Sequence, residues 1–377
     1  MNSKVMTTGL TSHLAWAHVI MFSAWLLLTI SPLHAQETQE KVDVNDVSRT
    51  YVVHLPQGYD KAQHYPVVIL LHGQNQDTDD IARLTHFSQF AEKNGVIAVY
   101  ALSARGQWNI GVRPEQSSDM GPRRYGRRGM GGGGYPGGGG GYPGGGGGGY
   151  PGGGYPGGQR GGQNPDENTT RSEPADDVAF LGQMLDALAL KFSVDNHRVY
   201  AAGLGDGGFM ALRAACTTAD RIAAIAVVSA ALPKTMICLP SRAVPALFIA
   251  GTEDPVVPYS GGEYKPGRFH VLSAEESAKT WAKFDRCGEK PAQGKLPALD
   301  KDKDKNAKET KTLTFSGCQE NAEVTLYEVK NGGHTWPGGE QYSSEKEVGK
   351  VSNAVNANEA IWSFLSKQKL PAESTAK

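Results

Sequence analysis

Three separated segments carry residues that together could perform acyl transfer. Asp254 follows an apolar run at 248–251, and His334 lies in the glycine-rich segment 331–338. An aspartate that orients a histidine, and a histidine that removes a proton from a nucleophile, are two parts of a catalytic triad. The third part belongs in a glycine-rich turn, and such a turn stands upstream at 203–207. The order of turn, acid and histidine predicts a hydrolytic site.

The turn lacks a side chain where the nucleophile is needed. Residues 203–207 read Gly-Leu-Gly-Asp-Gly, whereas a nucleophile elbow reads Gly-x-Ser-x-Gly. Gly205 therefore occupies the serine position and offers no side-chain oxygen. Asp206 comes one residue late, so we expect its carboxylate to point away from the apex. Two active alternatives stay open: Asp206 as a nucleophile, or a water activated by His334 in the volume that the serine vacates.

Backbone amides are expected to complete the site. A strand-like run leads into Leu-His-Gly-Gln at 71–74, and a helix is predicted to begin shortly after the glycine turn. The N–H groups of Gln74 and Asp206 are the predicted oxyanion donors. Other residues near these segments are expected to have structural roles. His72 is interpreted as a structural residue of the loop, and Trp108 and Trp336 as either core residues or walls of a pocket. Asp176 and Asp177 are expected at the amino terminus of a helix, where the helix dipole favours acidic residues.

Residues 203–208 also match the pattern Gly-x-Gly-x-x-Gly, which is typical of dinucleotide-binding loops. The match lies late in the chain, and no acidic residue stands out about 20 residues further on, at the end of a following strand. A dinucleotide site is therefore the weaker interpretation. No metal cluster or cofactor motif is predicted elsewhere.

Short apolar runs alternate with helical patterns along most of the chain. Such alternation predicts an α/β fold with a mostly parallel central sheet and helices on both faces. The expected strands are 51–55, 67–71, 96–100, 198–202, 225–229, 246–250 and 323–329, and the expected helices are 79–94, 177–192, 209–218, 274–284 and 356–365.

Composition limits the function classes and marks two insertions. With 377 residues, 39% hydrophobic, and a net charge of −1, the chain can bury a core but is not a dedicated nucleic-acid binder. Many of its 48 glycines fall in 111–171, among arginines and Tyr-Pro pairs, which predicts a flexible insertion. An adhesive or polymer-binding role for this insertion stays open. Residues 289–311 are predicted as a charged loop, which leaves 36–110 and 172–377 as one discontinuous domain.

The amino-terminal segment 1–35 has the layout of a secretory signal peptide. Lys4 precedes an apolar run at 15–30, and the segment ends at the small residue Ala35. A retained membrane anchor is the rival, but the run is shorter than the ~20 residues that span a bilayer. We therefore expect a secreted or periplasmic protein with no membrane partner after cleavage.

Export makes the four cysteines interpretable. None lies in a Cys-x-x-Cys pair, so an oxidising compartment favours two disulfides with three pairings open. Sequential pairing closes the shortest loops. The cysteines are Cys216, Cys238, Cys287 and Cys318.

The chain resembles secreted α/β-hydrolases of the polyhydroxybutyrate depolymerase and feruloyl-esterase type, including LpqC-like esterases. The resemblance is carried in order by residues 71–73, 83–85 with their helix, 107–109, 176–180, 198–211, 220–226, 251–259 and 333–338. It implies the α/β-hydrolase fold, Asp254 and His334 as triad acid and base, and both sequential disulfides. It also implies small esters, polyesters or acylated polysaccharides as ligands, without nucleic acid. Because Gly205 departs from the family pattern, serine-type hydrolysis is predicted to be lost or strongly impaired.

Overall fold

The computed structural model describes residues 37–112, 175–267, 269–296 and 310–371. The predicted signal peptide, most of the 111–171 insertion and residues 297–309 of the charged loop lie outside these ranges.

A ten-stranded sheet forms the centre of the described chain, in the order β1-β2-β4-β3-β5-β6-β7-β12-β11-β10. Its six middle strands, from β4 to β12, pair in parallel, while the strands at both edges pair antiparallel. The strands are β1 (Glu37–Val44), β2 (Val47–His54), β3 (Tyr65–Leu71), β4 (Ile97–Ala101), β5 (Val194–Leu204), β6 (Ala224–Val228), β7 (Ala246–Gly251), β10 (Ala292–Leu296), β11 (Thr310–Phe315) and β12 (Val324–Val329).

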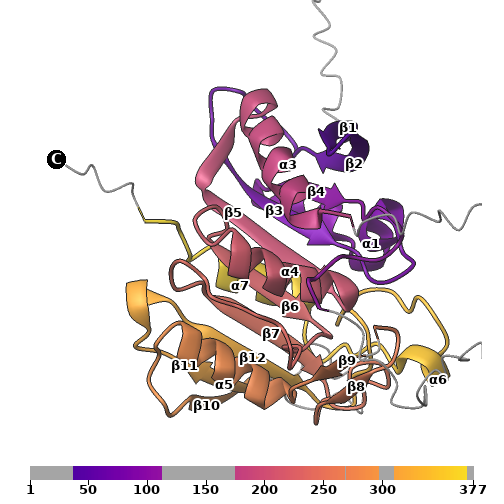
Figure 1. The fold of residues 1–377 in the computed structure, drawn as a ribbon, viewed down its shortest axis with the longest axis vertical. Helices are drawn as coiled ribbons and strands as arrows, with labels where there is room; N and C mark the ends of the chain where they lie inside the picture. The colour runs from indigo at the N-terminus through magenta and orange to yellow at the C-terminus, as the bar shows by residue number, and fades with distance from the viewer. Residues whose placement is uncertain (1–36, 113–174, 268, 297–309, 372–377) are drawn as a thin grey trace, which may run out of the picture. The chain divides into compact units, whose positions relative to one another are not determined.

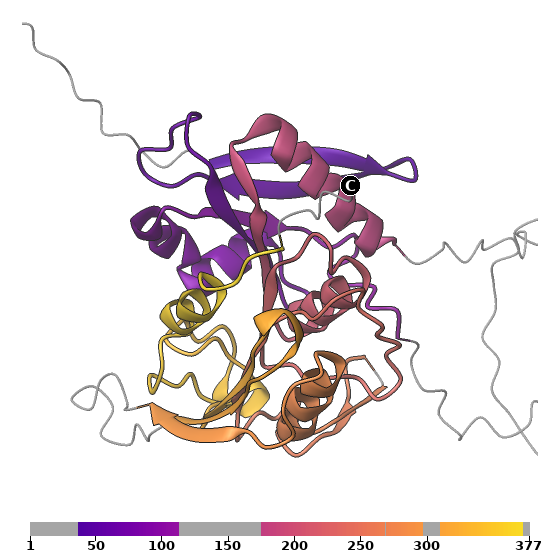
Figure 2. The ribbon, with the colours of Figure 1, turned by 90° about the vertical axis from the view of Figure 1, so that its left-hand side faces the viewer.

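Helices cover both faces of this sheet (Figures 1 and 2). Side chains of the parallel strands alternate between two apolar clusters, one on each face of the sheet. In β3, for example, Val67 and Ile69 belong to one cluster and Val68 and Leu70 belong to the other. One cluster packs against α3 (Asp177–Lys191), α4 (Asp206–Thr217) and α5 (Ala274–Phe284), and the other against α1 (Thr78–Thr85), α2 (Phe87–Asn94) and α7 (Ala357–Leu365).

This arrangement is the α/β-hydrolase fold, which confirms the fold class predicted from the sequence. Strand continuity explains why the prediction succeeds: the parallel strands are buried on both faces, so they read as short uninterrupted apolar runs. Smaller elements complete the described chain: the hairpin β8 (Gly262–Tyr264) and β9 (Phe269–Val271), the 3-10 helix η1 (Gln319–Asn321) and the short helix α6 (Glu345–Val348).

Several boundaries differ from the predicted ones. The single helix expected at 79–94 is two helices, because His86 adopts a left-handed conformation with φ 53° and ends α1. The edge strands β1 and β11 and the hairpin were not predicted. Within the expected charged loop at 289–311, Ala292–Leu296 forms β10 and pairs with β11. Edge strands are partly exposed and carry many polar residues. They therefore lack the uninterrupted apolar run by which the central strands are recognised in the sequence.

Both predicted disulfides are present with sequential pairing. Cys216 bonds to Cys238, and Cys287 bonds to Cys318. The second bridge links the end of α5 to the segment after β11. Cys216 lies within α4 and Cys287 just after α5, so both bridges begin at helices of the same face of the sheet.

Candidate active site

The turn after β5 consists of one residue, Gly205. β5 continues to Leu204 and α4 begins at Asp206, so the strand ends later and the helix begins earlier than predicted. Gly205 has φ 54° and ψ −113°, and its N–H donates to the carbonyl oxygen of Val228 at 2.9 Å. A Cβ at Gly207 would lie 1.9 Å from the carbonyl oxygen of Leu71, which explains the need for glycine there. The turn has the strand-turn-helix geometry of a nucleophile elbow.

Asp254 and His334 form a buried hydrogen-bonded pair beyond the carboxyl ends of β7 and β12. Oδ2 of Asp254 lies 2.9 Å from Nδ1 of His334. Oδ1 of Asp254 accepts the backbone N–H groups of Val256 and Val257, both at 2.8 Å. A carboxylate at Nδ1 favours the imidazole tautomer with its proton on Nδ1, which leaves the lone pair on Nε2.

Nε2 of His334 faces the bend of the elbow. A Cβ built on Gly205 would lie 2.5 Å from Nε2 and 3.0 Å from Cε1. The fold thus brings together the turn, the acid and the histidine that the sequence singled out. The ring itself stands where a serine side chain would begin. The expected vacant volume for a water is therefore filled in this arrangement, and such a water would require the ring to move.

A neighbouring serine does not substitute for the missing one. Ser229 directly follows β6 and is buried beside the elbow, since Val228 accepts the Gly205 N–H. Its Oγ donates to the carbonyl oxygen of Thr335 at 3.2 Å rather than to the imidazole of His334. Ser229 is thus held by the backbone of the histidine loop.

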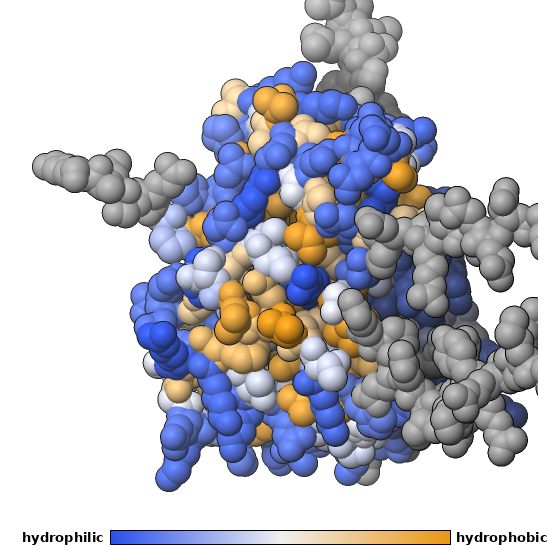
Figure 3. All heavy atoms as spheres, in the orientation of Figure 1, coloured by the Kyte–Doolittle hydropathy of each residue, from blue (hydrophilic) through white to orange (hydrophobic). Residues whose placement is uncertain are grey.

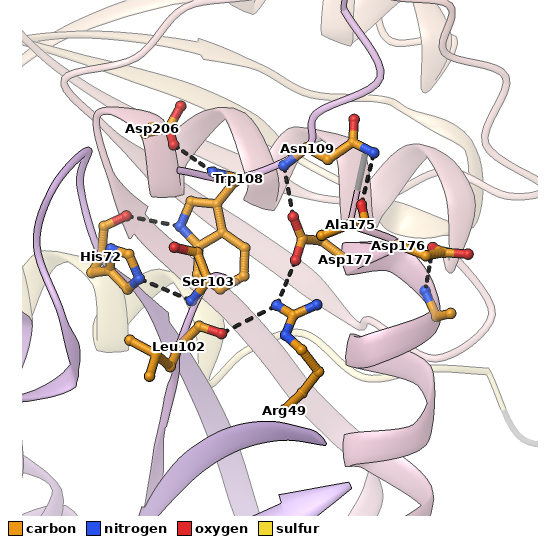
Figure 4. Close-up of polar contacts among 11 residues, drawn as sticks. Arg49, His72, Leu102, Ser103, Trp108, Asn109, Ala175, Asp176, Asp177 and Asp206 are labelled. Carbon is orange, nitrogen blue, oxygen red and sulfur yellow. Dashed lines mark hydrogen bonds and ion pairs between the residues drawn. The ribbon is translucent and has the colours of Figure 1, made fainter. Parts of the chain in front are cut away.

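The loop at Trp108 connects the two segments that were predicted to supply oxyanion amides (Figure 4). The backbone N–H of Trp108 donates to Oδ2 of Asp206 at 2.7 Å, and its indole N–H donates to the carbonyl oxygen of His72 at 2.9 Å. His72 is buried, and its Nε2 accepts the N–H of Ser103 at 3.1 Å. His72 therefore has the structural role predicted for it, and Trp108 ties the elbow to the 72–74 loop.

Asp206 is directed toward this loop. Its side chain is nearly inaccessible, and burial raises the pKa of its carboxyl to about 7, against the lowering effect of the Trp108 N–H. The negative charge of Asp177 raises the pKa further. Asp206 is consequently protonated at mildly acidic pH, when an ordinary aspartate is ionised.

The raised pKa gives the folded protein a specific pH dependence. Between the unfolded value of 3.8 and about 7, the native state binds more protons at Asp206 than the unfolded state does. Its contribution to the free energy of unfolding is therefore present below the unfolded pKa and is lost as pH rises through the folded pKa. We expect Asp206→Asn, which does not titrate, to gain stability relative to the wild type across this range.

Urea unfolding of both proteins from about pH 4 to about pH 8 measures the difference. The pKa of Asp285 is also raised by burial to about 7, but Asp285 is common to both proteins and cancels. A difference that stays constant with pH would contradict the prediction.

An ion pair that the sequence did not reveal holds the other side of the Trp108 loop (Figure 4). Nη2 of Arg49, on β2, lies 2.6 Å from Oδ1 of Asp177, and neither side chain is more than 4% exposed. Oδ2 of Asp177 accepts the N–H of Asn109 at 2.6 Å. Asp176 caps α3 through the N–H of Ala179, as predicted. Asp177 is thus also a positioning residue, and only its helix-terminal role was predicted.

The histidine loop is fixed by further buried bonds. Trp336 is 1% exposed, and its indole N–H donates to Asn358 on α7 at 2.9 Å. Asn358 in turn donates to the carbonyl oxygen of Thr85. The hydroxyl of Tyr342 donates to the carbonyl oxygen of His334 at 3.0 Å. Of the two alternatives considered for Trp336, the structure therefore supports a core residue.

Among the residues that the structure describes, no group of three or more His, Cys, Asp or Glu side chains is arranged to hold a metal ion. No helix among these residues is long and apolar enough to cross a bilayer.

Comparison with known proteins points to esterases. A family model described as "Putative esterase" matches residues 45–118, which include the 72–74 loop but neither the elbow nor the acid–histidine pair. The chain is 34% identical over 169 residues to Feruloyl esterase B of Piromyces equi, covering 42% of this chain and 29% of that protein. It is 30% identical over 212 residues to "Putative esterase NocK" of Nocardia uniformis subsp. tsuyamanensis, covering 54% and 60%. These matches span less than two thirds of either relative.

Among solved structures, the chain is similar to an acetyl xylan esterase from Aspergillus awamori, with a TM-score of 0.47 and 11% identity over 79% of this chain and 94% of that one. A thermostable esterase gives a TM-score of 0.46 and 12% identity over 88% and 63%. The relatives that the chain matches in sequence are described as esterases.

Proposed function

We propose that this protein is an exported relative of carboxylic-ester hydrolases that has lost serine-type hydrolysis. The observation that carries the proposal is Gly205 at the bend of an otherwise intact elbow, facing the lone pair of His334. Without an oxygen at that place, the Asp254–His334 pair has no hydroxyl to deprotonate and no acyl-enzyme can form there. The retained pair and the predicted amides of Gln74 and Asp206 fit binding of an ester carbonyl.

The ligand class follows from the sequence relatives. They are described as a feruloyl esterase and an esterase. Small esters and acylated polysaccharides are accordingly the ligands that we propose for this site. Export is supported by the two disulfides, which persist in oxidising compartments.

The alternative catalytic routes have less support. Asp206 accepts the N–H of Trp108, and its side chain is held in the loop rather than at the bend. A water activated by His334 would need the imidazole to retreat from the position beside Gly205. Losing the nucleophile of a triad lowers turnover by about 10⁴- to 10⁶-fold, so any residual hydrolysis would be slow.

A turnover assay tests the proposal. The mature protein and its His334→Ala variant are compared on p-nitrophenyl butyrate and methyl ferulate. We expect the same slow rate from both, far below that of a serine esterase. Rapid turnover by the wild type that His334→Ala abolishes would show that the site is a working esterase.

A further inference from the structure

A hollow lies on the α5 face, remote from the elbow. It has a volume of about 640 Å³ and is formed by the exposed side of α5, the segment that follows it and the end of β11. Asp285, just after α5, accepts the N–H of Val244 through Oδ1, which places this segment beside the start of β7. The elbow and His334 lie at the opposite, carboxyl-terminal ends of the strands.

Positive charge dominates the lining of this hollow, which we call the basic pocket. It contains four cationic side chains and one carboxylate: Lys279, Lys283, Arg286, Lys290 and Glu289. All five residues are exposed. The macrodipole of α5 favours cations in its last turn, which accounts for Lys283 and Arg286 but not for Lys279 or Lys290. The whole chain has a net charge of −1, so the excess is local.

The backbone of the basic pocket is held firmly. Arg286 adopts a left-handed conformation with φ 52°, which is costly for a residue other than glycine. The N–H of Arg286 donates to Lys283, that of Cys287 to Ala282, and that of Gly288 to Ser316. The Cys287–Cys318 bridge anchors the same turn. The backbone that carries Arg286 and its neighbours is therefore fixed before any ligand arrives, which reduces the cost of ordering it on binding.

The chemistry of the lining identifies the ligand class. Four cations attract a ligand with several negative groups, and an open, concave hollow suits a chain better than a flat membrane surface. Phe315 and Ala282 contribute a small apolar part of the lining. The carboxylate of Glu289 can accept hydrogen bonds from hydroxyl groups, whereas it would repel a ligand rich in phosphates. All lining residues except Phe315 are non-aromatic, so bases of single-stranded nucleic acid find no exposed stacking platform.

We infer that the basic pocket binds an acidic polysaccharide through its carboxylates and hydroxyls, at a site separate from the candidate active site. The direct probe is an oligogalacturonide titrated into the full mature chain by calorimetry. The matched ligand is the same oligomer after reduction of its carboxyl groups. The variant is Lys279→Gln with Lys283→Gln, two residues one turn apart on one face of α5. The control is Lys61→Gln with Lys93→Gln, which removes the same charge from exposed positions elsewhere.

We expect the oligogalacturonide to bind about tenfold more weakly to the α5 variant than to the wild type and to the control variant, and more weakly in high salt. The reduced oligomer should not bind. Equal binding to all three proteins, or equal binding of the reduced oligomer, would overturn the inference. Single-stranded DNA of similar length that binds as tightly would also overturn it. Because binding is the readout, failure here is distinguishable from failure of the proposed function.

Discussion

Gly205→Ser should create an esterase. The elbow, the Asp254–His334 pair and the helix amide of residue 206 are already present, and the substitution supplies the missing oxygen. Loss of a serine nucleophile costs about 10⁶ in turnover, and a misplacement of about 1 Å costs about 10²-fold. The Cβ must displace Nε2 of His334, which lies 2.5 Å from its ideal position. We therefore expect a partial recovery, of at least about 10²-fold on p-nitrophenyl butyrate.

Gly205→Ala is the matched control for this gain. It brings the same Cβ and the same backbone strain at φ 54° but no hydroxyl. It should stay at the wild-type rate, while Gly205→Ser combined with His334→Ala should lose the gain. A folded Gly205→Ser protein without increased turnover would contradict our claim that the rest of the site is competent.

Arg49→Met should destabilise the protein severely. It leaves the carboxylate of Asp177, which is fully buried, without its cationic partner. Removing one member of a buried ion pair costs about 3–5 kcal/mol, because the remaining charge is uncompensated. Arg49 also lies over the ring of Phe180, with Cζ 4.2 Å from the centroid, so its loss weakens packing against α3. Urea unfolding at neutral pH measures the change in the free energy of unfolding.

Two variants define the cause of this loss. Arg83→Met removes a guanidinium that is 53% exposed and paired with Asp80 and Glu340, and it should cost far less than Arg49→Met because solvent screens exposed ion pairs. Arg49→Met with Asp177→Leu removes both charges and should be less damaging than Arg49→Met alone. An Arg49→Met protein as stable as Arg83→Met would show that the buried pair does not hold the loop.

Sequence patterns sufficed for the parts of the fold and site that depend on local order. The parallel strands, the placement of α3, α5 and α7, the two disulfides and the meeting of Asp254 with His334 were all predicted. The strands and helices follow from short apolar runs and helical periods, and the acid and histidine from the order of their motifs. The disulfide pairing is what the shortest loops and the family resemblance implied. The glycines around residue 205 were informative because only glycine permits such close approach to Leu71.

Tertiary contacts explain what the sequence left open. Arg49 and Asp177 are 128 positions apart, and neither lies in a motif that predicts an ion pair. The position of the His334 ring against Gly205 depends on backbone placement that spacing cannot give, and it replaced the expected water-sized volume. The break between α1 and α2 occurs at His86, and no glycine or proline at that position predicts it from the sequence. The basic pocket is likewise assembled from α5, a disulfide-bonded turn and β11.

Labelling with a fluorophosphonate most directly tests the claim that residue 205 supplies no nucleophile. The reagent phosphonylates activated serine hydroxyls and is read out by intact-protein mass spectrometry. The mature wild type should show no adduct, whereas Gly205→Ser should be modified at residue 205. Stoichiometric labelling of the wild type at any serine would contradict the account.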